Sequence, residues 1–226
     1  MKQEVIVFAE GQSEESFIKK IVAPTLHHLQ IYLEPQLLQT SKNAQGGAVS
    51  FDRLKFNARN TLRQYPNVVL TTFLDLYGLD TDFPKFQDAK NNTDIYARLN
   101  VMEDALTQAI ISHVSCRPER FIAYFQPYEL EGLFFSDVEA LVRTEPDWKK
   151  QLTRLQKVRA SFQTPEHIND SYETKPSKRL ENILSPSYKK TRHGPLIAEQ
   201  VTLSKMEQEC PHFKGWLNQL RGLAKT

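Results

Sequence analysis

Short runs of apolar residues alternate along the chain with segments in which apolar positions recur every three or four residues. Three runs, at 4–9, 67–74 and 121–125, are almost continuously apolar, which is typical of strands buried on both faces of a parallel sheet. A fourth run, 31–39, could be a further strand, but Pro35 makes it either an edge strand or a poor one. This order predicts an α/β fold with a mostly parallel sheet flanked by helices.

Helices are expected between these runs, from the spacing of apolar residues and from capping residues at their starts. They begin after Gly11 with Ser13 as the cap, near Phe51, after Asp94, and at about Asp137 with Ser136 as the cap. The stretch 76–92 is rich in Gly, Pro, Asp and Asn and predicts a long loop, and Gly46-Gly47 marks another loop.

Beyond about residue 145 the pattern is helical and is interrupted by prolines. We therefore predict an α/β core of residues 1–145 and a basic, mostly helical extension of residues 146–226 packed on it. Residues 1–142 contain 13 Lys+Arg and 18 Asp+Glu, whereas residues 143–226 contain 16 and 9. Such asymmetry is expected of a carboxylate site beside a polyanion-binding surface. The alternative is that the solvent-exposed surfaces of the two parts differ in the sign of their net charge by chance.

The composition excludes several classes of protein. Of the 226 residues, 40% are hydrophobic and 25% are charged, which argues against disorder. No apolar run approaches the ~18 residues of a membrane span, and the start resembles a strand rather than a signal peptide. Cys116 and Cys210 stand alone, without the spacing of a zinc site. We therefore expect a cytoplasmic protein without a disulfide framework.

Acidic residues follow three of the predicted strands. Glu10 follows the first, Asp75 the third, and Glu129 and Glu131 lie just after the last. The carboxyl ends of parallel strands share one edge of a sheet, so these carboxylates should converge there. Hard oxygen ligands favour Mg²⁺ or Mn²⁺, which serve phosphodiester chemistry. Because loops are polar, acids at strand ends can also be incidental.

The first of these strand ends carries a family resemblance. Val5-Ile6-Val7-Phe8-Ala9-Glu10-Gly11, followed by a helix, resembles the opening of the Toprim domain of topoisomerases, primases and overcoming-lysogenization-defect-type nucleases. Asp75-Leu76-Tyr77-Gly78 stands where Toprim domains carry an Asp-x-Asp strand end.

A longer pattern resembles a Toprim-like bacterial family, domain of unknown function 4276. Its marks span nearly the whole chain: Glu10-Gly11-x-x-Glu14, Asp75-Leu76-Tyr77-Gly78 with Asp82-Phe83-Pro84, Tyr128-Glu129-Leu130-Glu131-Gly132 through Asp137, Lys178-Arg179-Leu180, Tyr188 through Gly194, and Cys210-Pro211-His212-Phe213.

The resemblance implies a metal-dependent nuclease fold and an ATPase partner, since members are often encoded beside an ATPase in bacterial antiviral defence islands. Two positions depart from the pattern. Tyr77 replaces the second Asp of Asp-x-Asp, which removes a carboxylate from a two-metal site. Tyr128 stands where the family pattern places His.

We assign the roles accordingly. Asp75 is the principal ligand of Mg²⁺ or Mn²⁺, Glu129 or Glu131 is a second, and Glu10 is a ligand or the general acid/base. Strand alternation favours Glu129 over Glu131. Glu14 either binds metal or complements the dipole of its helix.

A basic stretch at 175–192 is expected to hold phosphates. Its candidate nucleic-acid-binding residues are Lys178, Arg179, Lys189, Lys190 and Arg192, with His193 as a proton-transfer candidate or a turn residue. The alternative for the stretch is a solvated helical face.

The resulting hypothesis is a Toprim-like nuclease that cuts DNA or RNA as the effector of an anti-phage system. One alternative is a non-catalytic subunit that binds nucleic acid or docks on the ATPase, and another is a phosphohydrolase of a small substrate. No GxxxxGK[ST] or GxGxxG motif occurs, so energy would come from the partner. Whether the chain forms a homo-oligomer is left open.

Overall fold

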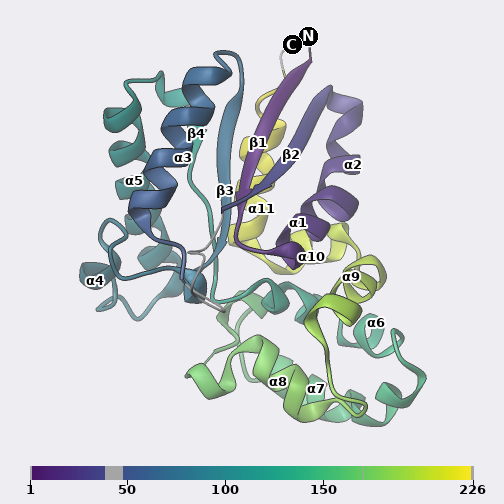
Figure 1. The fold of residues 1–226 in the computed structure, drawn as a ribbon. Helices are drawn as coiled ribbons and strands as arrows, with labels where there is room; N and C mark the ends of the chain where they lie inside the picture. Colours follow the sequence, from purple (N-terminus) through teal and green to yellow (C-terminus); the bar gives the residue numbers. More distant parts are fainter. Residues whose placement is uncertain (1, 39–47, 170, 225–226) are drawn as a thin grey trace.

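Five parallel strands form the centre of the computed structural model, which describes residues 2–38, 48–169 and 171–224 (Figure 1). The order is β2-β1-β3-β4, and β5 pairs with β3. The α/β fold with a parallel sheet flanked by helices is confirmed. The strands are β1 (Gln3–Ala9), β2 (Ile31–Leu37), β3 (Val69–Asp75), β4 (Phe121–Ile122) and β5 (Phe125–Gln126).

At two places in the sheet, side chains modify the strands that the apolar runs predict. Pro35 of β2 pairs with Val7 of β1, and β2 lies at the edge of the sheet as predicted. The run 121–125 was expected as one strand but is divided into β4 and β5. The division arises because the Thr72 hydroxyl accepts a hydrogen bond from the Tyr124 N–H and donates one to the Tyr124 carbonyl, each at 2.8 Å. A side chain thereby replaces the backbone ladder at that residue.

Helices cover both faces of the sheet (Figure 1). Leu54 of α3 and Leu99 of α5 belong to one apolar cluster with Ile6 and Leu70 of the sheet. On the opposite face, Val5 and Phe73 cluster with helices from both ends of the chain. The helices up to residue 142 are α1 (Gln12–Phe17), a π-helix (Ile18–Val22), α2 (Ala23–Leu26), α3 (Phe51–Gln64), α4 (Phe86–Ala89), α5 (Ile95–Val114) and α6 (Val138–Val142), with 3₁₀ turns at His27–Leu29, Leu76–Gly78, Pro118–Arg120 and Leu130–Ser136.

The predicted caps are only partly right. Asp94 caps α5 by accepting a hydrogen bond from the Tyr96 N–H. The cap of α6 is Asp137, which accepts from Ala140, and not Ser136. Ser13 does not cap α1 either, because the helix begins one residue earlier, after Gly11. The expected loop 76–92 contains a 3₁₀ turn and α4, and Gly46-Gly47 lies outside the described residues.

The C-terminal part is helical and packs on the sheet. Trp216 of α11 donates a hydrogen bond to Thr71 of β3 at 3.0 Å and stacks on Tyr124. Residues on both sides of position 145 therefore share one core. Within the described ranges, no helix is both long and apolar enough to cross a membrane. The helices are α7 (Leu152–Ala160), α8 (Pro176–Ile183), α9 (Lys190–Val201), α10 (Leu203–Glu209) and α11 (Pro211–Arg221), with 3₁₀ turns at Pro146–Gln151, Pro165–His167 and Tyr172–Thr174.

His212 anchors the start of α11 to the sheet. Its Nε2 lies 2.9 Å from the Glu103 carboxylate, which also accepts the N–H of Phe125 in β5. Glu166 accepts the backbone N–H groups of His212 and Phe213. Burial opposes the imidazolium charge, but the hydrogen bond to Glu103 and the negative charges of Glu103 and Glu166 together outweigh it, so that the pKa of His212 is raised above its ordinary value.

This ion pair predicts a pH dependence of stability. A histidine whose pKa is higher in the folded than in the unfolded state stabilises the fold fully at pH values below its unfolded pKa, about 6.5. This contribution to the free energy of unfolding is lost as the pH rises through the higher pKa of the folded state. Between about pH 6 and pH 9, the free energy of unfolding of the wild type should therefore fall relative to that of His212→Gln. Urea denaturation across this range measures the difference, and His28→Gln, which removes an exposed imidazole, is the matched control. Parallel curves for His212→Gln and the wild type would contradict the prediction.

Candidate functional site

Four carboxylates gather at the carboxyl edge of the sheet; we call them the acidic cluster (Glu10, Glu14, Asp75 and Glu131). Glu10 directly follows β1, Asp75 ends β3, and these strands are hydrogen-bonded neighbours. Glu131 comes from the 3₁₀ turn after β5, and Glu14 from the first turn of α1. The parallel sheet thus brings Glu10 and Asp75 to one edge, as the strand order predicts.

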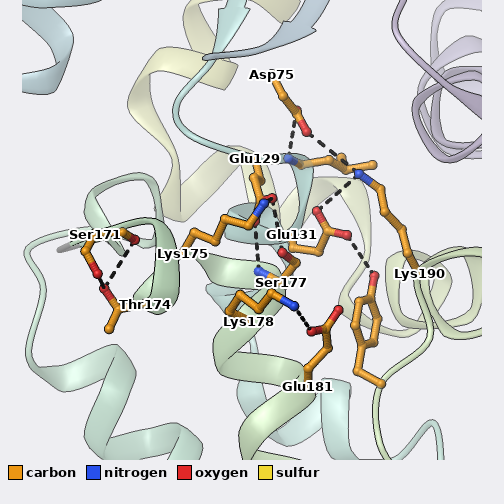
Figure 2. Close-up of polar contacts among 12 residues, drawn as sticks. Asp75, Glu129, Glu131, Ser171, Thr174, Lys175, Ser177, Lys178, Glu181 and Lys190 are labelled. Carbon is orange, nitrogen blue, oxygen red and sulfur yellow. Dashed lines mark hydrogen bonds and ion pairs between the residues drawn. The ribbon is translucent and has the colours of Figure 1, made fainter. Parts of the chain in front are cut away.

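A lysine from the C-terminal part enters this cluster. The ammonium of Lys190, at the start of α9, lies 3.1 Å from Glu14. It also lies 3.6 Å from Glu131 and 3.8 Å from Asp75 (Figure 2). Burial would lower the pKa of Lys190, but these carboxylates outweigh it and raise the pKa above its ordinary value. One positive charge is therefore shared among several acidic groups.

The acidic cluster is buried except for the half-buried Glu10, and it is incompletely neutralised. Asp75 is 4% and Glu131 0% exposed. Burial, reinforced by Glu14, raises the pKa of Glu10 to about 7. Burial likewise raises the pKa values of Asp75 and Glu131, although Lys190 opposes both shifts. Carboxylates crowded in this way favour either a proton or a further cation.

Backbone contacts hold two of these acids. The Leu130 N–H donates to the Asp75 Oδ1 at 2.9 Å. The Glu10 carboxylate lies against Gly78, where an added Cβ would stand 1.7 Å from the Glu10 Oε2. No side chain larger than hydrogen fits at position 78 unless Glu10 moves. The backbone of the 3₁₀ turn after β3 therefore packs directly against the Glu10 carboxylate.

Glu129 has other partners. Its carboxylate accepts the Ser177 N–H at 2.9 Å and the Ser177 hydroxyl at 3.1 Å, and it pairs with the Lys175 ammonium at 2.7 Å (Figure 2). The structure therefore places Glu131, rather than Glu129, against Lys190. Strand alternation favoured Glu129, but β5 ends at Gln126 and the chain turns into a 3₁₀ segment, so that alternation no longer applies.

The acidic cluster offers the donor atoms that a divalent cation prefers, but not the arrangement of a formed metal site. Within 2–38, 48–169 and 171–224, no group of three His, Cys, Asp or Glu side chains has the arrangement of a ready metal site. Among the described residues, the buried Glu10 Oε2 nevertheless lacks a hydrogen-bond partner, whereas the buried Glu14 Oε1 and Glu131 Oε2 are ion-paired with the Lys190 ammonium. Carboxylate oxygens are the ligands that Mg²⁺ and Mn²⁺ prefer. Glu10, Asp75 and Glu131 could hold such an ion, with Glu14 beside them.

Most of the predicted phosphate-binding residues contact other groups of the protein. Lys190 lies in the acidic cluster, Lys178 pairs with Glu181, and Arg192 pairs with Glu145. Arg179 donates to the Thr174 carbonyl, and Lys189 is exposed. The side chains of the predicted basic stretch are thus mostly engaged with other groups, and their pairing with acids 3 to 176 positions away in the sequence was not visible in its composition.

His193 is not a turn residue. It lies in α9, is 1% exposed and packs edge-on against Trp148 at a centroid distance of 4.8 Å. Its Nδ1 accepts the Lys189 N–H at 2.9 Å, which fixes the imidazole at the start of the helix. Burial lowers the pKa of His193 from its ordinary value. The residue supports the helix that delivers Lys190.

Sequence reasoning missed two features of the site. Lys190 was assigned to phosphates, although its ammonium neutralises the acidic cluster. Glu14 was weighed mainly as a partner of the helix dipole. The signal for Glu14 was its place in the first turn of the helix that directly follows β1 and Glu10, in the motif Glu10-Gly11-x-x-Glu14.

Comparison with known proteins assigns the chain to a family. No curated protein and no solved structure matches the chain. One family model, described as "Domain of unknown function (DUF4276)", matches residues 9–221, a span that contains every residue of the acidic cluster and Lys190. The chain therefore belongs to the DUF4276 family.

Proposed function

We propose that this protein is a nuclease that depends on Mg²⁺ or Mn²⁺ and hydrolyses phosphodiester bonds of DNA or RNA. The observation that carries the proposal is the acidic cluster, in which the Lys190 ammonium contacts three of the four carboxylates and the buried Glu10 Oε2 has no hydrogen-bond partner among the described residues. The expected Toprim relationship, the antiviral role and the ATPase partner are part of the same proposal and rest on the sequence resemblance.

The residues would divide the work as follows. Glu10, Asp75 and Glu131 would hold the ion, which when bound polarises a phosphoryl oxygen and lowers the pKa of water. Glu10, whose pKa is raised to about 7, is suited to exchange a proton near neutral pH. Lys190 offsets the charge of the cluster and so lessens its repulsion of a phosphate.

A non-catalytic subunit is the competing proposal, and one observation favours it. Lys190 already supplies a cation to the acidic cluster. Tyr77, in place of the second acid of Asp-x-Asp, further reduces the number of ligands. In this case the cluster would be a structural ion-pair network, and the protein would bind nucleic acid or dock on its ATPase partner without cutting.

A cleavage assay separates the two. We expect the purified protein, alone or with the ATPase encoded beside it, to cut single-stranded DNA, duplex DNA or RNA when Mn²⁺ is present and not when EDTA replaces it. The thermal unfolding midpoint should also rise with Mn²⁺, because an ion that binds only the folded state stabilises it. Absence of cleavage in every combination, together with an unchanged midpoint, would favour the non-catalytic subunit.

A further inference from the structure

Three tyrosines form a partly exposed aromatic surface next to the acidic cluster; we call them the tyrosine surface (Tyr77, Tyr128 and Tyr172). The ring centroids of Tyr77 and Tyr128 are 5.6 Å apart, and those of Tyr77 and Tyr172 are 6.5 Å apart. Tyr77 is 38% and Tyr172 61% exposed. Rings exposed to this extent contribute little to the core, so burial does not account for their grouping.

The tyrosine surface and the acidic cluster are held by the same two chain segments. The Tyr77 N–H donates to the Tyr128 carbonyl at 3.1 Å, only two residues beyond the contact between Asp75 and the Leu130 N–H. Tyr128 has a φ of 58°, a left-handed conformation that is unfavourable for a bulky residue. Such strain persists where surrounding contacts enforce it. The rings are therefore placed at a defined position beside Asp75.

Two cations accompany the rings. The Lys175 ammonium lies 4.4 Å from the centroid of Tyr172 and 5.9 Å from that of Tyr77, while it pairs with Glu129. Arg98 interacts electrostatically with Tyr77 and Tyr128, and its buried Nε has no hydrogen-bond partner among the described residues. Aromatic faces beside cations are the combination with which proteins bind unpaired nucleotides.

We propose that the tyrosine surface stacks unpaired bases, so that the protein takes single-stranded nucleic acid. Every base has an aromatic face, but a duplex hides these faces within its own stack. Bases held on Tyr77 and Tyr172 would bring the neighbouring phosphodiester to the edge where Asp75 lies. This inference rests on the proposed function for the role of that bond, whereas the stacking itself requires no cleavage.

Binding measured without metal tests the stacking alone. Fluorescence anisotropy in EDTA would use three labelled probes: an oligothymidine of about 20 nucleotides, the duplex of that strand with its complement, and an oligouridine of the same length. About 20 nucleotides exceeds the roughly 4–16 that a single-strand-binding OB fold contacts. We expect Tyr172→Ala and Tyr77→Ala each to weaken binding of both single strands by about 5- to 100-fold. Tyr172→Phe and Tyr77→Phe should retain binding because they keep the aromatic face. Affinity for the duplex should be the same in all variants.

Phe56→Ala is the matched control, since Phe56 of α3 is 64% exposed and lies outside the tyrosine surface. It should bind single strands as the wild type does, and thermal unfolding should show that all variants are folded. Unchanged binding by both alanine variants, equal losses for single strands and duplex, or a wild type that prefers duplex would each overturn the inference. Tyrosine-dependent binding without any Mn²⁺-dependent cleavage would instead uphold it and reject the nuclease.

Discussion

Asp75→Asn is expected to lower Mn²⁺-dependent cleavage by about 10³-fold, because a bound ion supplies several kcal/mol of charge stabilisation and each 1.4 kcal/mol is a factor of ten. The amide keeps an oxygen that can accept the Leu130 N–H, so the local backbone contact survives. Removing one charge from a crowded cluster also lessens its repulsion of phosphates. Affinity for nucleic acid should therefore stay equal to that of the wild type or rise.

Single-turnover cleavage and binding measured on the same preparations test this prediction. Asp88→Asn is the matched control, since Asp88 is exposed and pairs with Lys85 away from the acidic cluster; it should cut at the wild-type rate. If Asp75→Asn cuts as fast as the wild type, Asp75 is not the principal ligand. Loss of both cleavage and the thermal unfolding transition would point to misfolding, and Asp75→Ser then provides a second, uncharged variant.

Lys190→Met is expected to lower the free energy of unfolding by about 1–3 kcal/mol at neutral pH in the absence of metal, less than the 3–5 kcal/mol of a fully buried pair. The discount reflects the side-chain exposure of Lys190, which is 41% and allows solvent screening. The cause is the loss of the ammonium shared by Glu14, Asp75 and Glu131. These carboxylates would remain buried without a counter-charge.

Mn²⁺ should restore much of the stability that Lys190→Met loses. An ion at 100 times its dissociation constant stabilises the folded state by about 2.7 kcal/mol, and in Lys190→Met it no longer competes with the ammonium. The midpoint of thermal unfolding should therefore rise more with Mn²⁺ in Lys190→Met than in the wild type. Lys178→Met, which breaks the surface pair with Glu181, is the control and should show neither effect. A variant that is destabilised but indifferent to Mn²⁺ would identify the cluster as a structural ion-pair network.

The strands were predictable because burial on both faces leaves a continuous apolar run, and the prolines and acids that end these runs are visible in the sequence. The division of 121–125 was not, since it depends on the Thr72 hydroxyl reaching Tyr124 from a neighbouring strand. The caps at Ser13 and Ser136 were misplaced by one or two residues because several polar residues stand at each helix start. Such choices depend on contacts that local patterns do not encode.

The sequence by itself determined the parallel sheet and the convergence of Glu10 and Asp75, because right-handed crossovers place the carboxyl ends of parallel strands at one edge. Only the tertiary structure decided how the charges there are matched. In the folded protein Glu131 lies against Lys190, whereas Glu129 binds Lys175 and Ser177. Much of the basic stretch is paired with acidic residues. Charge pairing depends on distances of a few ångströms between residues far apart in the chain, and neither periodicity nor composition specifies those distances.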